Sequence, residues 1–198
     1  MASDTRDRLV RTTSRLLRKQ GYGATGLNQV MAEAQAPKGS MYFHFPGGKE
    51  ELAAAAVDYF AERVMQRMEK GLAEGATVAE AVAGFFDGYI EHFQRTAFCE
   101  GCAVATVVLD AAADHEALAA ATGRALRGWV DRFAEALEAE GRSPAEAHRL
   151  ATLIVAAIEG TIVIGKGERS TEPLVAVQAV LRDLLAVGDT APATAKTG

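Results

Sequence analysis

Apolar side chains recur every three or four residues along most of the chain, which is the spacing that lines one face of an α-helix. The alternating pattern of a half-buried strand, closed by hairpin turns, is not found. Glycine interrupts the helical pattern at intervals, as at Gly21, Gly75 and Gly141, and marks the ends of predicted helices. The pattern therefore predicts an all-α fold with about nine helices.

The predicted helices fall into an N-terminal and a C-terminal group. The first group is expected at residues 4–20, 27–34, 38–45 and 49–71. The second is expected at residues 77–96, at 103–113, from Leu118 up to Gly141, from Pro144 through the apolar run LATLIVAAIEGTIVIG, and at 172–187. We expect a helix-turn-helix domain at residues 1–48, an effector-binding and dimerisation domain at 49–187, and a disordered tail at 188–198.

Composition indicates a soluble protein. The 198 residues are 49% hydrophobic and 24% charged, and the sequence shows no apolar run near the ~20 residues of a membrane-spanning helix. The first segment, MASDTRDRLVRTTSR, is charged throughout and lacks the apolar centre of a signal peptide. We therefore expect a cytoplasmic location and no membrane contact.

Charge is distributed unevenly along the chain. Residues 1–50 contain eight Lys or Arg and four Asp or Glu, although the whole chain has a formal net charge of −5. A basic N-terminal quarter on an acidic body indicates that one end of the molecule meets a polyanion and the other does not.

The short predicted helices 27–34 and 38–45 are joined by a turn of about three residues, as in a helix-turn-helix. The major groove of DNA admits one helix, and only its outward face and first turn reach base edges. The second helix is rich in side chains that can bond to bases and phosphates: Lys38, Ser40, Tyr42 and His44. Met41 and Phe45, four residues apart, are expected to hold it to the protein core. Composition alone equally fits an ordinary amphipathic surface helix.

The segment ATGLNQVMAEAQAPKGSMYFHFPGGKEELAAAAV resembles the DNA-binding domain of the TetR family of bacterial transcriptional regulators. The similarity covers about residues 5–58 and includes the pattern K-G-[ST]-[LM]-Y-x-[HY]-F-x-x-K-[ED]-x-L. The segments FPGGK and EGCAVATVVLD are similar to the LmrA/YxaF-like subgroup, with Ala103 where that subgroup has proline. The resemblance implies that the helix from Lys38 is the recognition helix. It also implies DNA contacts from these residues: Thr25, Asn28, Lys38, Gly39, Ser40, Tyr42, Phe43, His44 and Lys49.

Two residues of this head depart from the family pattern. Gly26 stands where the family often has a small polar helix cap, which weakens the cap. Gln35 stands where the family often has a turn glycine, and a positive φ there would cost about 1 kcal/mol or more. Neither departure removes an expected DNA contact.

The last two predicted helices have more apolar surface than one partner helix can cover. A four-helix interface with a second copy explains that excess best, and the resemblance implies the same homodimer. Such a dimer places two recognition helices about one DNA turn apart and predicts a pseudo-palindromic operator. The alternative is a monomer whose last helices cover each other.

An effector pocket is expected between the long helix from Lys49 and the other helices of the body. Residues with the size and spacing to line it are Met65, Met68, Phe85, Phe86, Tyr89, Phe93, Thr106, Trp129, Phe133, Ile158 and Thr161. An aromatic-lined cavity with a few hydroxyls suits a flat hydrophobic molecule, and the acidic body slightly favours a cation. Each of these residues also fits an ordinary core position.

Cys99 and Cys102 form a C-x-x-C motif, which suits a redox disulfide or half of a zinc site. The only nearby histidines in sequence, His92 and His115, are isolated, so no metal site is predicted. A thioredoxin-like oxidoreductase needs a βαβ context that the helical pattern lacks. Buried packing cysteines, a reversible thiol switch and a thiol oxidoreductase remain as alternatives.

These features together predict a homodimeric, ligand-responsive repressor. A small hydrophobic or aromatic effector would release it from double-stranded operator DNA by pivoting the helix that starts near Lys49. The nearest alternative replaces the effector by oxidation of Cys99 and Cys102, and a helical adaptor would make no use of the basic head. No catalytic constellation and no cofactor motif is recognised, so we expect neither enzymatic activity nor a cofactor.

Overall fold

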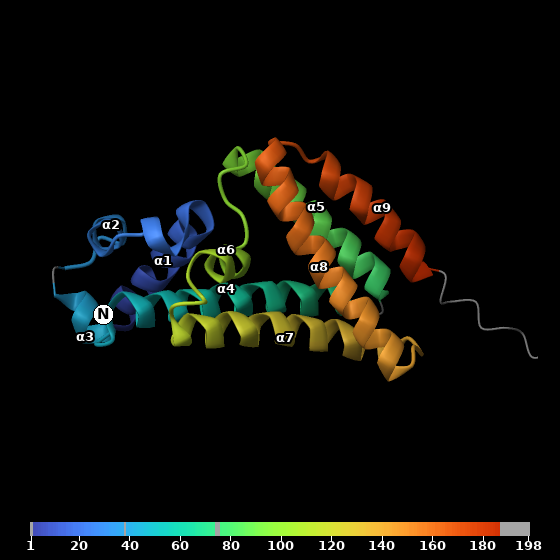
Figure 1. Cartoon of the computed structure of the whole chain (residues 1–198), viewed down its shortest axis with the longest axis horizontal. Coiled ribbons are helices and arrows are strands. Elements are labelled where there is room, and N and C mark those ends of the chain that lie inside the picture. The colour runs from blue at the N-terminus through green and yellow to red at the C-terminus, as the bar shows by residue number, and fades with distance from the viewer. Residues whose placement is uncertain (1, 38, 74–75, 187–198) are drawn as a thin grey trace, which may run out of the picture.

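The computed structural model describes residues 2–37, 39–73 and 76–186, with the side chains of Ala2 and Ser3 left aside. Within these ranges the chain forms nine α-helices and no strand, which confirms the predicted all-α fold. The predicted disordered tail, residues 188–198, lies outside the described residues. Figure 1 shows α1 to α3 gathered at one end of an elongated molecule and α8 and α9 toward the other.

The head consists of α1 (Ala2–Ala24), α2 (Leu27–Glu33) and α3 (Ser40–His44), and α4 (Gly48–Leu72) leaves it as a long helix. Helical geometry in α1 is broken at Gly21, whose φ of 78° and ψ of 179° lie in a region open almost solely to glycine. The regular geometry of α1 is therefore interrupted directly after Gln20, where the sequence predicted its end. The third helix begins at Ser40 rather than at residue 38, because Gly39 takes a left-handed φ of 97° before it.

The head has a small core of its own. Met41 and Phe45 are each only 1% exposed, which confirms that they hold α3 down. They pack in one cluster with buried side chains of α1, α2 and α4: Leu9, Val10, Leu16, Val30, Ala34 and Leu52. The remaining face of α3 is left to solvent.

The body consists of α5 (Val78–Thr96), α6 (Ala103–Asp110), α7 (Glu116–Ala139), α8 (Pro144–Glu168) and α9 (Glu172–Ala186). Figure 1 shows α4 and α7 running side by side, with α5, α8 and α9 grouped above them. The sixth helix ends three residues before its predicted end, because the backbone of Ala111 (φ −145°) leaves helical geometry.

Local sequence signals explain where the body helices begin. The Thr77 hydroxyl accepts a hydrogen bond from the Glu80 N–H, and the Glu80 carboxylate accepts one from the Thr77 N–H, forming a capping box for α5. Ser143 caps α8, and Pro144 occupies its first turn, where a missing N–H costs no helical hydrogen bond.

By length and composition α8 alone, among the described helices, would be apolar enough to cross a membrane, which the sequence pattern did not lead us to expect. It packs against α7 and α9 and contributes Ile154, Ile158 and Ile162 to the main core. A helix apolar on several faces is also what a covered position in a helical protein requires.

Candidate functional site

The outward face of α3 carries two exposed aromatic side chains. Tyr42 is 63% and Phe43 77% exposed, while Met41 and Phe45 on the opposite face are buried. Large aromatic residues left in water on an otherwise well-packed helix mark a contact surface rather than core packing. The His44 ring lies edge-on to Phe43, with centroids 5.0 Å apart, and extends the same surface.

The first turn of α3 also belongs to this surface. The Ser40 hydroxyl donates a 2.8 Å hydrogen bond to the Pro37 carbonyl, and Gly39 has no heavy atom within 4 Å of where a Cβ would stand. Lys38, which the sequence assigned to groove or phosphate contact, lies outside the described residues. The turn before α3 contains Gln35 with a φ of 51°, so this non-glycine residue does take the positive φ whose cost was considered from the sequence.

Thr25 and Asn28 differ in how they meet solvent. Asn28 is exposed in the first turn of α2. Thr25 is 2% exposed, and its hydroxyl donates a 2.5 Å hydrogen bond to the Gly21 carbonyl. In this arrangement Thr25 secures the turn between α1 and α2, and a DNA contact from its side chain stays a prediction.

Lys49 in the first turn of α4 packs against the head. Its Nζ lies 4.2 Å from the centroid of the Tyr22 ring and 3.4 Å from the Gly23 carbonyl oxygen. Partial burial lowers the pKa of Lys49, against an opposing effect of the Asp110 carboxylate. The ammonium group is thus held against the end of α1, just before the turn that leads into α2.

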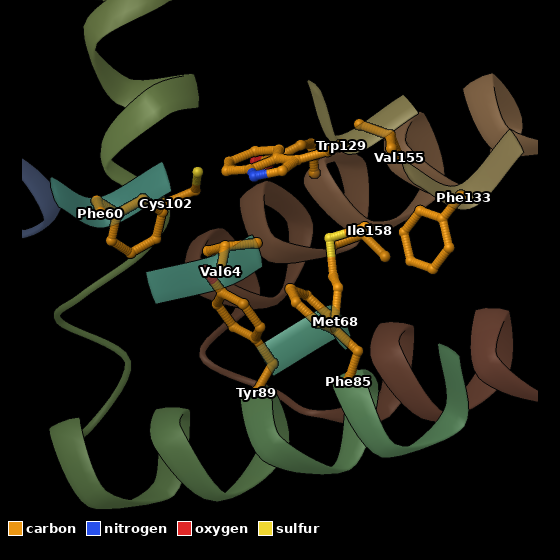
Figure 2. Close-up of a pocket in the computed structure, with 11 residues that line it drawn as sticks. Phe60, Val64, Met68, Phe85, Tyr89, Cys102, Trp129, Phe133, Val155 and Ile158 are labelled. Atoms are coloured by element: carbon orange, nitrogen blue, oxygen red, sulfur yellow. The ribbon is translucent and has the colours of Figure 1, made fainter. Parts of the chain in front are cut away.

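A second candidate site is an apolar cavity inside the body (Figure 2). Five elements supply its walls: α4, α5, the residue before α6, α7 and α8. Its lining residues are Phe60, Val64, Met68, Phe85, Tyr89, Cys102, Trp129, Phe133, Val155, Ile158 and Glu159. We call it the inner pocket. Its volume of about 10 Å³ is at the lower limit for a single water molecule, so any larger ligand requires side chains to move.

The inner pocket brings together some of the residues that the sequence assigned to it. Met68, Phe85, Tyr89, Trp129, Phe133 and Ile158 line it. The other assigned residues lie outside its lining: Met65, Phe86, Phe93, Thr106 and Thr161. The two threonines donate to carbonyl groups of their own helical turns, to Cys102 and Ile158, so their hydroxyls serve the backbone.

Sequence reasoning missed Phe60, Val64, Cys102, Val155 and Glu159 as lining residues. A signal existed for two of them, because Phe60, Val64 and Met68 are spaced four apart on α4 and share one face. Another signal was the single acid within the apolar run LATLIVAAIEGTIVIG.

Glu159 is the one acidic residue in the lining of the inner pocket. Its Oε2 atom is buried without a hydrogen-bond partner among the described residues. Burial raises the pKa of Glu159 to about 7, against a smaller lowering effect of the neighbouring Cys102 thiol. A carboxyl group that is half protonated near neutral pH can donate or accept a hydrogen bond from a ligand.

The two cysteines have different surroundings. Cys99 is exposed and Cys102 is buried, and both are free thiols. Burial, followed by the charge of Glu159, raises the pKa of Cys102 well above its ordinary value. Because the thiolate is the reactive form, this environment disfavours Cys102 as a redox nucleophile. Within the described residues no three His, Cys, Asp or Glu side chains gather as metal ligands would.

The sixth helix connects the inner pocket to the head. Cys102, its N-cap residue, lines the pocket, and Asp110, its last residue, accepts a 2.7 Å hydrogen bond from the Gly23 N–H of the head. A second link joins the body to α1 through two hydrogen bonds between Arg18 and Gly101. The Arg18 side chain donates to the Gly101 carbonyl, and the Gly101 N–H donates to the Arg18 carbonyl. A displacement at the pocket can therefore reach the head through one short helix.

Comparison with known proteins gives matches over both parts of the chain. The family model described as "Bacterial regulatory proteins, tetR family" matches residues 9–56, and that described as "Transcriptional regulator LmrA/YxaF-like, C-terminal domain" matches residues 78–180. The chain is 34% identical over 182 residues to the HTH-type transcriptional regulator LmrA of Bacillus subtilis (strain 168), covering 92% of this chain and 97% of that protein.

Two further matches agree with these. An HTH-type transcriptional regulator of Mycobacterium tuberculosis, Rv0196, is 35% identical over 185 residues, covering 91% of this chain and 93% of that protein. The solved structure of a TetR transcriptional regulator from Chloroflexus aurantiacus J-10-FL is similar with a TM-score of 0.78 at 27% identity, covering 93% of this chain and 96% of that one.

Proposed function

The chain belongs to the TetR family of bacterial transcriptional regulators, in its LmrA/YxaF-like group, and we propose that it is a homodimeric repressor released from operator DNA by a small hydrophobic or aromatic effector. The observation that carries the effector part of this proposal is the inner pocket. It is lined by aromatic and aliphatic side chains and contains one carboxyl oxygen, Oε2 of Glu159, that is buried without a hydrogen-bond partner among the described residues, a combination that favours a specific small ligand over empty core.

On the DNA side, the proposal assigns base and phosphate contacts to the head. Tyr42, Phe43 and His44 are presented together on the outward face of α3, and Ser40 and Gly39 stand at its start. Asn28 and Lys49 lie at the first turns of α2 and α4, where backbone N–H groups also meet phosphates. Lys38 and Thr25 complete the set implied by the family pattern.

The homodimer is proposed to form through α8 and α9. Both helices expose aliphatic side chains, namely Leu153, Val163, Ile164, Val175, Val180 and Leu184. On α8 these alternate at helical spacing with small residues such as Ala156 and Gly160, which allow a second helix to approach closely. Two copies joined there form a four-helix interface and present two heads to successive major grooves of a pseudo-palindromic operator.

Release is proposed to work through α6. The inner pocket is small and must expand around a ligand, and Cys102 in its wall is the N-cap of the helix whose other end holds Gly23. Moving α6 therefore tilts the head and the start of α4. An effector that binds the two states about 100-fold differently shifts the equilibrium by roughly 2.7 kcal/mol, which lies within the usual range of allosteric coupling free energies.

A thiol switch is not favoured as the alternative, because burial of Cys102 opposes the thiolate form. As a regulator that acts on chromosomal DNA, the protein is assigned to the cytoplasm, without catalytic activity or a cofactor.

The effector assignment is tested by blocking the inner pocket. Val155→Phe adds a ring to the pocket wall, whereas Val108→Phe adds the same ring to an exposed position of α6 that is absent from the lining. A panel of hydrophobic aromatic compounds is screened for release of a fluorescent duplex taken from upstream of the protein's own gene. Compounds that release the wild type and Val108→Phe should leave Val155→Phe on the DNA. Equal release of all three proteins would contradict the assignment.

A further inference from the structure

A wide cleft lies next to the inner pocket, between α1 of the head and helices α4 and α5. Its volume is about 670 Å³. Seven of its lining residues are cationic: Arg11, Arg15 and Arg18 from α1, Arg63, Arg67 and Lys70 from α4, and Arg95 from α5. We call it the basic cleft. Although the chain as a whole is acidic, this cleft concentrates positive charge from three helices that are distant in sequence.

Little negative charge compensates these cations. Glu100 is the one carboxylate in the cleft lining, and it forms an ion pair of 3.2 Å with Arg18. Arg15 is paired with Glu33. Among the described residues, the other cations of the cleft have no carboxylate within ion-pair distance: Arg11, Arg63, Arg67, Lys70 and Arg95.

The cationic side chains of the cleft also affect the pKa of its histidine, His92. Burial, then the charges of Arg18, Arg95 and Arg67, lowers the pKa of His92 to about 4. The His92 ring stays neutral at physiological pH, with its Nδ1 and Nε2 atoms facing guanidinium groups of Arg95 and Arg18. Surplus positive charge in a partly enclosed cleft attracts an anion more strongly than the same charge on an open surface.

The basic cleft and the inner pocket share a wall. Phe60, Val64, Phe85 and Tyr89 line both spaces. The Arg18 guanidinium carbon lies 5.3 Å from the centroid of the Phe60 ring, so charge and apolar surface meet at this boundary. A molecule with an apolar part in the inner pocket would place a polar end among the arginines of the cleft.

DNA is a poor candidate for this cleft. At 1.5 Å rise per residue, Arg63 and Lys70 lie about 20 and 30 Å along α4 from Lys49, where the helix leaves the DNA-facing head. The cleft is also lined by aromatic side chains, which a phosphate backbone does not require.

We propose that the effector is an amphipathic organic anion, and that the basic cleft binds its carboxylate or phosphate group while its apolar part enters the inner pocket. This inference rests on the proposed effector-controlled function and narrows its ligand class. The anion would bridge Arg11 of the head helix to Arg63 and Arg67 of α4. Its binding would therefore also affect the angle between head and body.

The test uses two probes with one ring system. 1-Anilinonaphthalene-8-sulfonate carries an anionic group, and N-phenyl-1-naphthylamine is the same aromatic skeleton without it. Both become fluorescent in apolar surroundings, so their affinities are measured by titration at one fixed salt concentration. The cleft variant is Arg63→Gln/Arg67→Gln, and Arg127→Gln/Arg132→Gln on α7 is the control with the same change of net charge.

We expect the cleft variant to bind the sulfonate probe about tenfold more weakly or worse, because two charge-assisted hydrogen bonds are lost. The neutral probe should bind wild type, cleft variant and control alike. Unchanged sulfonate affinity in the cleft variant, or an equal loss for both probes, would overturn the anion site while leaving the inner pocket in place. If neither probe binds the wild type, both the anion site and the proposed pocket function fail. Operator affinity that falls in the cleft variant, without a change in sulfonate binding, would assign the arginines to DNA and overturn the proposal.

Discussion

The backbone N–H of Gly23 donates a 2.7 Å hydrogen bond to the Asp110 carboxylate, joining the turn before α2 to the last residue of α6. The two residues are 87 positions apart, so this bond crosses from the body to the head. Asp110 also faces the ammonium group of Lys49, whose pKa it acts to raise. One carboxylate thus binds the turn before α2 and acts electrostatically on the lysine at the start of α4.

Removing that carboxylate should loosen the head without unfolding the protein. Asp110→Ala leaves the Gly23 N–H to water and should cost about 1 kcal/mol, since the site is exposed. Hydrogen–deuterium exchange should accelerate at Gly23 and its neighbours, with the core of α8 unchanged. Asp114→Ala, an exposed acid in the same segment, is the control. Equal exchange at Gly23 in both variants would show that Asp110 does not hold the head.

The conformation at Gly21 can be tested by comparing two glycine substitutions in opposite surroundings. Gly21→Ala should destabilise the protein by about 1–3 kcal/mol, because φ and ψ there are strained for any residue with a Cβ. The added Cβ would also stand 2.8 Å from the Asp110 Oδ2 atom, which cannot retreat without losing Gly23. Gly84→Ala on α5 meets nothing within 4 Å and should stabilise by up to about 1 kcal/mol. The unfolding temperature, followed by circular dichroism, should fall for Gly21→Ala and rise for Gly84→Ala. A change in the same direction for both variants would contradict this explanation.

Glu159 makes stability depend on pH. Its folded-state pKa of about 7 lies above the ordinary value of 4.5, so the folded protein holds this proton more tightly than the unfolded chain. Stability is therefore lost as pH rises from about 4.5 to 7, by up to roughly 3 kcal/mol. Glu159→Gln removes that loss, so the variant should gain stability relative to wild type between pH 5 and pH 8.

The measurement is the difference in unfolding temperature between variant and wild type at the two pH values. An amide in the same place has its own burial cost, but that cost does not change with pH. Glu168→Gln, an exposed residue of the same helix, should show no such trend. A constant difference between pH 5 and pH 8 would mean that Glu159 is not kept neutral by burial.

The homodimer proposal predicts that charge on α8 and α9 separates the protomers. Val163→Glu/Val180→Glu places a carboxylate on each exposed apolar face, 53% and 64% exposed at present. Sedimentation should show a dimer for wild type and a monomer for the variant, with helical content retained. Leu109→Glu, at an exposed apolar residue of α6, should remain dimeric. A wild-type monomer, or a variant dimer, would exclude this interface.

Helix positions followed from sequence periodicity because apolar spacing decides which face of a helix is buried. Met41 and Phe45 were placed correctly for that reason. Local pattern did not show that Thr25 turns inward, because its partner is the carbonyl of Gly21 in a glycine-specific conformation.

The two sites proposed for the effector were harder to predict, because each is assembled from several helices. Met65 and Phe86 are of the same residue types as Met68 and Phe85 and lie on the same two helices. Only the rotation of each helix about its axis decides which side chain lines the inner pocket and which packs elsewhere in the core. The acidic body slightly favoured a cationic ligand, yet the arginines of α1, α4 and α5 converge on one cleft. Net charge reports an average, whereas binding depends on which charges share a space.

The central claim is that the exposed face of α3 and the start of α4 bind operator DNA. Fluorescence anisotropy with a duplex from upstream of the protein's own gene tests this claim. The head variant is Tyr42→Ala/Lys49→Ala. The control variant is Leu109→Ala/Arg127→Ala, which removes one exposed apolar and one cationic side chain from the body. The head variant should bind about 100-fold more weakly, with a salt dependence smaller by about one phosphate contact, while the control binds like wild type. Undiminished binding by the head variant, with its fold intact, would contradict the claim.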